Sequence, residues 1–379
     1  MLYRQQITAA LIVSMATASA IAASNETARK QLPAAYCLYD LGRLPGLPTG
    51  ETSIAVNAIN NRNQVVGWTT LSGGYTPLRA FIWDRVNGMR DLGAPPGFPN
   101  PNPQDINDSG TIVGDATNSE TGVHRPVIWP EGGEVQLLDI SLGGARAGAG
   151  GINRSGQIVG GAEIILGSDQ THAFLREANG DVLDLGALSE GDRFSGASAV
   201  NNRGWVVGSS SDSFSTEAFI WDKRNGMRRL LENPGTLLTN ATDINDRGEV
   251  VGEKYDNGSR AFRWTRKEGL QDLGTLSGGD DDYATATAIN RWGHIVGASQ
   301  IETGGPAHAF LWSRRTGNLN LNQRIHPTSP LANVAVLVIA QDINDAGWIV
   351  ADGYIPEEAD PRRSFALVPR RGPDDVACP

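Results

Sequence analysis

The stretch that decides the fold is Asp105-Ile106-Asn107-Asp108-Ser109-Gly110-Thr111-Ile112-Val113-Gly114. Its recurring parts are Ile-Asn, two polar residues, Gly, one residue, two β-branched residues and Gly. Seven copies follow one another, with their asparagines at Asn60, Asn107, Asn153, Asn201, Asn245, Asn290 and Asn344. Repeats at intervals of 44 to 54 residues indicate a propeller or a solenoid.

Each copy has the chemistry of a β-hairpin. Glycine stands three residues after the asparagine in six copies, and Asn63 takes that place in the first. Glycine and asparagine adopt a positive φ most readily, so this position predicts a tight turn. The β-branched pair that follows, from Val65-Val66 to Ile349-Val350, favours a strand.

Two further phrases follow each hairpin. The first, exemplified by Ala80-Phe81-Ile82-Trp83, predicts a short strand with its large residues on one face. The second, exemplified by Met89-Arg90-Asp91-Leu92-Gly93, predicts another strand after a Gly-containing turn. The tryptophan of the first phrase recurs in five copies. A carbohydrate platform is one interpretation, but such regular repetition favours a core position between stacked sheets.

The order of the phrases at the two ends predicts a closed ring. The chain begins with a closing phrase, Tyr39-Asp40-Leu41-Gly42, and ends with an Ala-Phe-like phrase, Ser364-Phe365-Ala366-Leu367. The N-terminal strand can therefore complete the last unit and remove exposed sheet edges, whereas an open solenoid would leave two incomplete ends. We predict an all-β fold, a seven-bladed β-propeller over residues 36–370. Each blade has about four strands, and the N-terminal strand completes the last blade.

The segments outside the propeller are predicted to be short. Arg4 precedes an apolar, small-residue run from Ile7 to Ala23, which predicts a secretory signal peptide at residues 1–23. An N-terminal membrane anchor is the alternative. Residues 24–35 are predicted to be a linker and residues 371–379 a C-terminal tail. We therefore expect a protein that is secreted or periplasmic, with no transmembrane span after cleavage.

The two cysteines lie at opposite ends of the chain. Cys37 stands beside the first predicted strand, and Cys378 lies about ten residues after the last one. Because an exported chain meets an oxidising environment, we predict a disulfide between them that locks the ring, with two free thiols as the alternative.

Composition and charge limit the partners. The 379 residues include 46 glycines, a content expected for a chain with many short strands joined by turns. The chain carries a formal net charge of −10 at pH 7. An acidic chain repels phosphate backbones, so nucleic acid is not an expected partner. We expect a monomer that binds a polysaccharide or a surface protein.

Taken together, the three phrases resemble the HAF-repeat family of probable extracellular bacterial proteins. The triplet that gives this family its name stands here as His172-Ala173-Phe174 and His308-Ala309-Phe310. The resemblance covers residues 38–368 and implies export from a bacterium and a β-propeller-like fold. It implies no established activity, so no functional residue is carried over from it.

Two of the four connections in each unit are long and variable, and both kinds are expected on one face of the ring. Variable loops on a rigid scaffold are where binding usually occurs. We predict a ligand-binding face there, with ordinary solvated loops as the alternative. Its candidate residues are Trp68, Tyr75, Arg79, Arg193, Tyr255, Asp281 and Tyr283.

The position before each Ala-Phe phrase is basic or histidine in six copies, which suggests an anion-binding ring. A structural alternative fits three copies, which also carry an acid at the start of the hairpin and another ten residues later. We predict that these arginines form salt-bridge networks with the acids. The predicted networks are Asp105, Asp115 and Arg125; Asp243, Glu253 and Arg260; and Asp342, Asp352 and Arg363.

Catalysis has no local motif in this sequence, and we predict no cofactor and no metal site. Asp105-Ile106-Asn107-Asp108-Ser109-Gly110 mimics the opening of a calcium loop but lacks its twelfth-position acid. We expect a secreted, non-enzymatic propeller that binds a glycan or a protein through its variable loops. The alternative is a secreted lyase or hydrolase of acidic polysaccharide, with a site assembled from several blades. Its candidate catalytic residues are His172, His308, His326, Arg79 and Tyr255.

Overall fold

The computed structural model describes residues 31–47, 53–70, 78–212, 215–231, 238–255, 258–279, 282–356, 358, 362–370 and 378. The predicted signal peptide and most of the predicted linker and tail lie outside the described residues, as do Tyr75 and Asp281. Among the described residues, no helix has both the length and the apolar character needed to cross a membrane.

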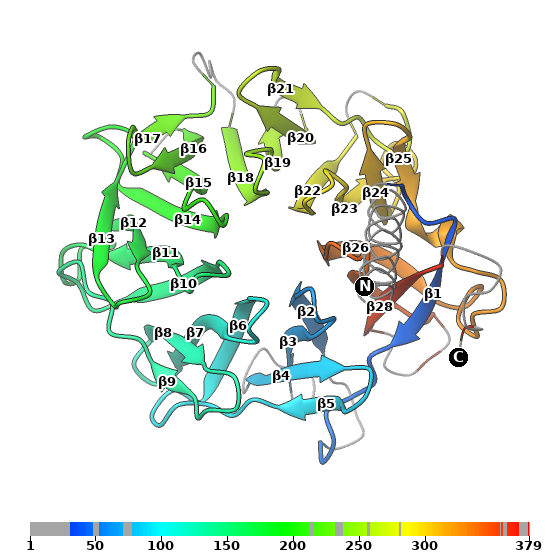
Figure 1. Ribbon diagram of the computed structural model, residues 1–379, viewed down its shortest axis with the longest axis horizontal. Helices are drawn as coiled ribbons and strands as arrows, with labels where there is room; N and C mark the ends of the chain where they lie inside the picture. Colours follow the sequence, from blue (N-terminus) through cyan, green and yellow to red (C-terminus); the bar gives the residue numbers. More distant parts are fainter. Residues whose placement is uncertain are drawn as a thin grey trace, which may run out of the picture.

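The chain is an all-β propeller, with its sheets arranged in a ring (Figure 1). Five sheets have four strands each, and one mixed sheet has eight. One four-stranded sheet consists of β2 (Ile54–Ile59), β3 (Val65–Thr70), β4 (Leu78–Asp84) and β5 (Gly88–Asp91). The next along the chain consists of β6 (Asn100–Ile106), β7 (Ile112–Asn118), β8 (Val123–Trp129) and β9 (Gln136–Leu137). A third consists of β18 (Leu238–Ile244), β19 (Val250–Tyr255), β20 (Ser259–Thr265) and β21 (Gly269–Asp272). The other two are β22 (Ala284–Ile289), β23 (Ile295–Gln300), β24 (Ala307–Ser313) and β25 (Gly317–Asn320); and β26 (Val336–Ile343), β27 (Ile349–Tyr354), β28 (Arg362–Arg370) and β1 (Ala35–Asp40).

The eight-stranded sheet consists of two consecutive runs of four strands. They are β10 (Ala147–Ile152), β11 (Ile158–Glu163), β12 (Thr171–Arg176) and β13 (Val182–Gly186), then β14 (Phe194–Val200), β15 (Val206–Ser211), β16 (Thr216–Asp222) and β17 (Gly226–Arg229). The two runs are joined by one parallel pair, Thr171 with Phe194. Each run otherwise follows the strand order of the four-stranded sheets.

The Asn-x-x-Gly turns have the predicted backbone conformation. Asn63 has a φ of 61°, and the corresponding glycines, such as Gly110 and Gly248, have φ values of 86° and 76°. The glycine that closes the phrase has a different role. A Cβ on Gly114 would lie 2.1 Å from the carbonyl oxygen of Asn102, because a β-bulge brings strand β6 close to it. Both glycines are therefore fixed by backbone geometry.

The second phrase supplies the core between neighbouring sheets. The side chains of Phe81, Phe174, Phe219, Phe262, Phe310 and Phe365 are fully buried. Trp83 is 6% exposed, and the half-buried Trp264 and Trp312 pack against core clusters. The prediction that the tryptophans occupy core positions is confirmed for Trp83, Trp129 and Trp221, and in part for the other two.

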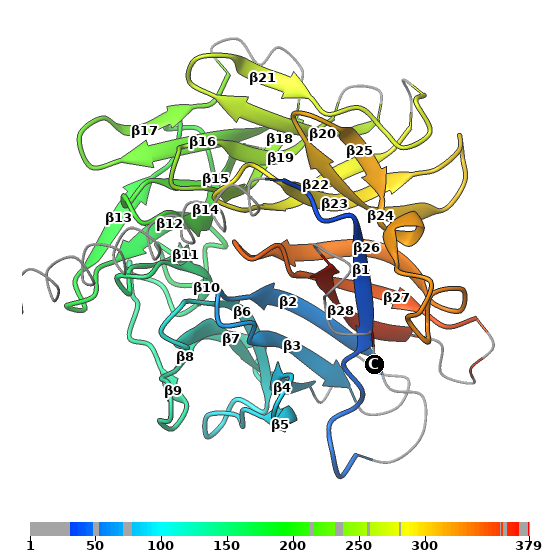
Figure 2. The same ribbon diagram turned by 45° about the vertical axis from the view of Figure 1, so that its right-hand side comes forward.

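The ring closes as predicted through the N-terminal strand. Strand β1 pairs antiparallel with β28, from Ala35 with Arg370 to Asp40 with Phe365 (Figure 2). The predicted disulfide joins Cys37 to Cys378, whose Cα atoms lie 5.2 Å apart.

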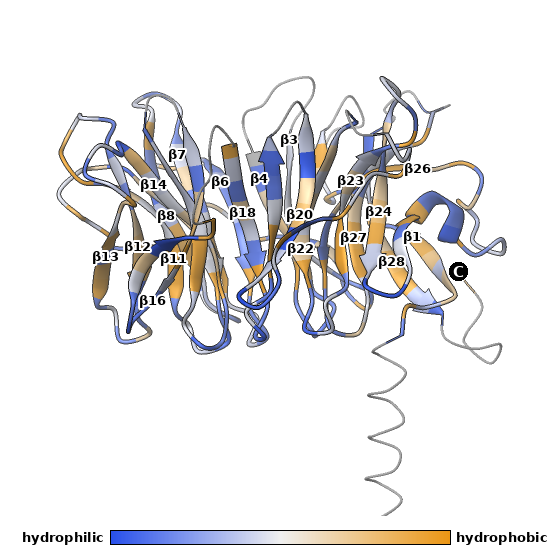
Figure 3. Ribbon diagram, turned by 90° about the horizontal axis from the view of Figure 1, so that it is seen from above, coloured by the Kyte–Doolittle hydropathy of each residue, from blue (hydrophilic) through white to orange (hydrophobic). Residues whose placement is uncertain are grey.

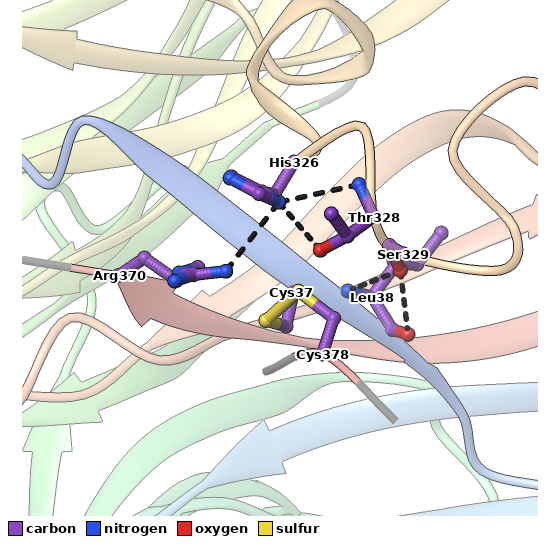
Figure 4. The surroundings of a disulfide bond; sticks show 7 residues. All are labelled: Cys37, Leu38, His326, Thr328, Ser329, Arg370 and Cys378. Atoms are coloured by element: carbon purple, nitrogen blue, oxygen red, sulfur yellow. Dashed lines mark hydrogen bonds between the residues drawn. A yellow bond between two sulfur atoms is a disulfide. The ribbon is translucent and has the colours of Figure 1, made fainter. Parts of the chain in front are cut away.

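The other edge of β1 is also paired. The segment after the 3-10 helix η1 (Leu321–Arg324) lies along it. The His326 N–H donates to the Tyr36 carbonyl at 2.7 Å, and the Ser329 hydroxyl bonds both the N–H and the carbonyl of Leu38 (Figure 4). The closing strand is therefore held on both sides and by a covalent bond.

Each strand runs between two opposite faces of the ring (Figure 3). The tight turns of the Ile-Asn phrase and those between the third and fourth strands of each unit lie on one face, which we call the turn face. The variable loops lie on the other, which we call the loop face.

Candidate functional site

The seven Ile-Asn turns meet at the centre of the ring and line a cavity of about 510 Å³. Each asparagine donates a hydrogen bond from Nδ2 to the backbone carbonyl of the next asparagine around the ring, at 3.0–3.1 Å. Each Oδ1 also accepts from the backbone N–H groups two and four residues further on, as in Asn107 with Ser109 and Thr111. The asparagines therefore both shape their own turns and join neighbouring units.

The next residue of the turn adds a second ring of bonds at the mouth of this cavity. The backbone N–H of Asn61 donates to Asp108, that of Asn202 to Asp246 and that of Arg291 to Asp345. Arg154 forms an ion pair with Asp108 at 2.7 Å. These polar groups bond one another across neighbouring units, so at the mouth of the cavity they hold the units together.

Three aspartates lie on the inner strands, two residues before the asparagine of their unit. Asp105, Asp243 and Asp342 each accept backbone N–H bonds from the residue that follows them and from an isoleucine of the next unit. Burial raises the pKa of Asp243 to about 6. Burial, and then the charges of Asp243 and Asp105, raises the pKa of Asp342 to about 8. Asp342 is therefore largely protonated at neutral pH.

The predicted arginine networks are not what the strand registers bring together. Glu253 lies opposite Ala261, and Asp352 lies opposite Ser364, so each arginine stands one position away from the acid's partner. Neighbouring residues of a strand point to opposite faces of the sheet, which separates each of these arginines from its acid. Asp115 likewise lies opposite Pro126 rather than Arg125.

The acid and the arginine of the third predicted network have other partners. Asp352 accepts bonds from Gln341, from Ser364 and from the Val56 N–H of the next unit. Arg363 pairs with Asp40 and Glu358. Among the described residues, Arg125 forms no ion pair.

In five of the seven units, the residue before the Ala-Phe phrase instead bonds the residue twelve positions later, on the outer strand of its own unit. Among these pairs are Arg79 with Asp91 at 3.6 Å and His172 with Asp184 at 2.9 Å. Arg260 with Asp272 at 3.2 Å and His308 with Asn320 at 3.0 Å follow the same pattern. In these five units, a charged or polar residue twelve positions after the one before Ala-Phe was the sequence signal that could have identified the pairs.

The histidines proposed as catalytic lie apart. His172 is on β12 and His308 on β24, in different sheets, and burial lowers the pKa of His308. His326 lies on the segment beside β1, where its Nδ1 contacts Thr328 and Arg370 (Figure 4). The three histidines therefore have separate bonding partners and do not form one cluster.

The loop face carries a second cavity, of about 600 Å³, between the ends of β15, β18, β19 and β22. Its walls include Tyr255 and Tyr283, which are 57% and 37% exposed, and also Glu253, Asn240 and Leu238. The sequence identified the two tyrosines as candidates for ligand binding. It did not identify Asn240 or Leu238, and it assigned Glu253 to a salt bridge.

The other predicted loop-face residues lie outside this cavity. Trp68 is on β3 and half-buried, and Arg79 is paired with Asp91. Arg193 is exposed, with its guanidinium 5.8 Å from the ring centre of Phe194. Of the predicted loop-face residues that the structure describes, Tyr255 and Tyr283 therefore line the cavity.

No family model and no curated protein matches the chain. Its fold is similar to that of puromycin hydrolase, with a TM-score of 0.55 and 14% identity over 86% of this chain and 54% of that one. A puromycin-hydrolyzing peptidase of Mycobacterium tuberculosis gives a TM-score of 0.54 and 13% identity over 85% and 53% of the two chains. The β-propeller domain of the Trilobed protease from Pyrococcus furiosus gives 0.54 and 11% over 84% and 95%. This chain spans about half the length of the two puromycin-hydrolyzing proteins, and at these identities the likeness shows the β-propeller fold alone.

Proposed function

We propose that this protein is a non-enzymatic binding module that takes up a neutral saccharide in the loop-face cavity. The observation that carries this proposal is that Tyr255, Tyr283 and Glu253 all line that cavity. Saccharides are bound by aromatic rings, which stack on their C–H faces, and by side chains that bond neighbouring hydroxyls.

The polar side chains of the cavity are available for such bonds. Glu253 and Asn240 are cross-strand partners on β19 and β18, so their side chains lie on the same face. Glu253 accepts one bond from the Ser259 hydroxyl, at 2.8 Å, through Oε2. Within the described part of the chain, its Oε1 and the Asn240 amide have no partner. A carboxylate next to an amide offers both acceptors and donors to adjacent hydroxyls.

The charge of the cavity favours a neutral ligand. Glu253 is its one charged side chain among the described residues, and a carboxylate repels a uronic acid. Burial, and then the charge of Glu253, raises the pKa of the Tyr283 phenol, which keeps that hydroxyl protonated. These features support a binder of neutral glycans over an enzyme acting on acidic polysaccharide.

The catalytic alternative draws no support from the placing of its candidate residues. Arg79, His172 and His308 are bonded to the outer strands of three different sheets. Tyr255 is the one candidate that lines the loop-face cavity. A site assembled from several blades needs such groups to converge on one reacting atom.

A glycan array probed with the purified protein tests the proposal. The chain offers a matched control, because Tyr354 stands at the position of β27 that Tyr255 occupies on β19 and is 36% exposed. We expect wild type and Tyr354→Ala to bind the same neutral glycans, and Tyr255→Ala and Glu253→Gln to lose that signal by tenfold or more. Equal signals for Tyr255→Ala and wild type, or an array with no hits, would contradict the proposal.

We also infer that the ring has seven blades, with the eight-stranded sheet counting as two. The single parallel pair between β12 and β14 and the seven separate core clusters support this count. Seven blades also suit the resemblance to HAF-repeat proteins. The Cys37–Cys378 disulfide is consistent with export through the predicted signal peptide. We propose a secreted or periplasmic monomer.

A further inference from the structure

The turn face is basic over three consecutive units, on a chain whose formal net charge is −10. The turn between the third and fourth strands carries adjacent basic residues in Lys223-Arg224, Arg266-Lys267 and Arg314-Arg315. The corresponding turns of the first three units, at residues 84–87, 130–133 and 177–180, hold one basic residue, Arg85.

Most of these side chains have no partner within the described residues. Lys223, Arg224, Arg266, Lys267 and Arg315 are exposed and form no ion pair there, whereas Arg314 pairs with Glu268. The inner turns of the same units add Arg203, Arg247 and Arg291. We call these nine residues the basic crescent.

The crescent includes a cavity of about 460 Å³. Its walls combine four arginines with the half-buried rings of Trp292 and Trp312 and with one carboxylate, that of Glu249. Glu249 pairs with Arg247 and Arg263, so Arg314 and Arg315 supply the cationic groups that it does not neutralise. Arg291 lies over the Trp292 ring, 4.6 Å from its centre. Cationic side chains around aromatic faces suit a ligand that has both anionic groups and flat apolar surfaces.

We propose that the basic crescent binds an acidic polysaccharide chain. Three dibasic turns on neighbouring units form an arc, which a polymer can follow and a small anion cannot span. The other charges of the molecule, acidic in sum, would repel such a polymer elsewhere and so orient it on this face.

The composition of the crescent favours this partner over two others. A membrane-surface site combines basic with exposed apolar residues, and none of the exposed large hydrophobic side chains of the described residues lies in the crescent. Nucleic acid carries about one charge per 1.7 Å of duplex and meets strong repulsion from a protein of this net charge, whereas a uronic-acid chain carries one charge per sugar.

Immobilised polygalacturonate tests the inference, with methyl-esterified polygalacturonate as the neutral control surface. We expect wild type to bind the acidic polymer alone, and to bind it much less at about 200 mM than at about 50 mM salt. The triple variant Arg224→Gln/Lys267→Gln/Arg315→Gln removes one unpartnered charge from each dibasic turn, so we expect binding about tenfold weaker.

A second triple variant controls for net charge. Arg125→Gln/Arg193→Gln/Arg362→Gln removes the same charge from sites outside the crescent and should bind as wild type does. Equal weakening in both triple variants, binding to the esterified polymer, or tighter binding to double-stranded DNA would overturn the inference. Tyr255→Ala should leave polygalacturonate binding unchanged, so this test and the glycan array fail independently.

Discussion

The side-chain amide of Asn344 donates a hydrogen bond to the backbone carbonyl of Asn60, 3.0 Å away and 284 positions earlier in the chain. The same bond links every other pair of neighbouring units, so seven asparagines form a closed circle of hydrogen bonds at the centre of the ring. Asn344 also accepts bonds from the N–H groups of Ala346 and Trp348. One buried residue type therefore stabilises both the turn and the contact between units.

Replacing Asn344 should cost stability at the seam where the ends of the chain meet. In Asn344→Ala the Asn60 carbonyl keeps the Asn63 N–H but loses its second donor, and two turn N–H groups lose the side-chain oxygen they donate to. We therefore expect a loss on the order of 3 kcal/mol in the free energy of unfolding. Asn201→Ala, which breaks the equivalent bonds inside the ring, should cost a similar amount. Urea unfolding measures both, and a loss below about 0.5 kcal/mol in either variant would show that the circle contributes little.

The disulfide should stabilise the ring by restricting the unfolded chain. Cys37 and Cys378 are separated by 341 positions, and the chain-entropy model gives a contribution on the order of 5 kcal/mol for so long a loop, as an upper figure. We expect reductant to lower the melting temperature of wild type and to leave that of Cys37→Ser/Cys378→Ser unchanged. Two free thiols in the unreduced protein, seen by mass spectrometry, would refute the bond.

A glycine closes six of the seven copies, and in the fourth copy this glycine, Gly208, should tolerate no side chain. A Cβ on Gly208 would lie 2.0 Å from the Gly196 carbonyl oxygen, so Gly208→Ala must displace backbone. We expect a loss on the order of 3 kcal/mol or a failure to fold. Gly191→Ala is the control, because its Cβ would meet no atom nearer than 3.9 Å. Thermal unfolding of both distinguishes this close approach from a general effect of alanine.

The buried aspartates should make stability depend on pH. A carboxyl whose pKa is raised by folding binds its proton more tightly in the folded state, so its contribution is present below the unfolded pKa of about 4 and lost as pH rises. The folded pKa values of about 6 for Asp243 and about 8 for Asp342 place the loss between about pH 4 and pH 8.

Comparison of Asp342→Asn with wild type checks this dependence. The amide cannot ionise, so the fall in the free energy of unfolding between about pH 5 and pH 9 should be smaller in the variant than in wild type. Asp169→Asn changes an exposed surface pair with Arg146 and should keep the wild-type fall. An unchanged fall in Asp342→Asn would mean that Asp342 is already ionised at pH 5.

Much of the fold could be predicted because the repeat specifies it locally. The phrases predict the turns and the strands. They also predict the closure by β1, since the last unit lacks a closing phrase and the chain begins with one that belongs to no other unit. The arginine networks could not be predicted, because the register of β19 with β20 and the β-bulge between β18 and β19 decide which face a side chain takes. Asn240 and Glu253 were missed for the same reason: they become neighbours only through that register.

Hydrogen–deuterium exchange of the protein with and without its strongest neutral glycan tests the central claim, that the loop-face cavity is the binding site. We predict slower exchange in peptides that carry Leu238–Ala241, Glu253–Tyr255 and Tyr283–Thr285, and no change in the seven Asn turns. Slower exchange confined to the turn face, or no change anywhere at saturating glycan, would contradict the account.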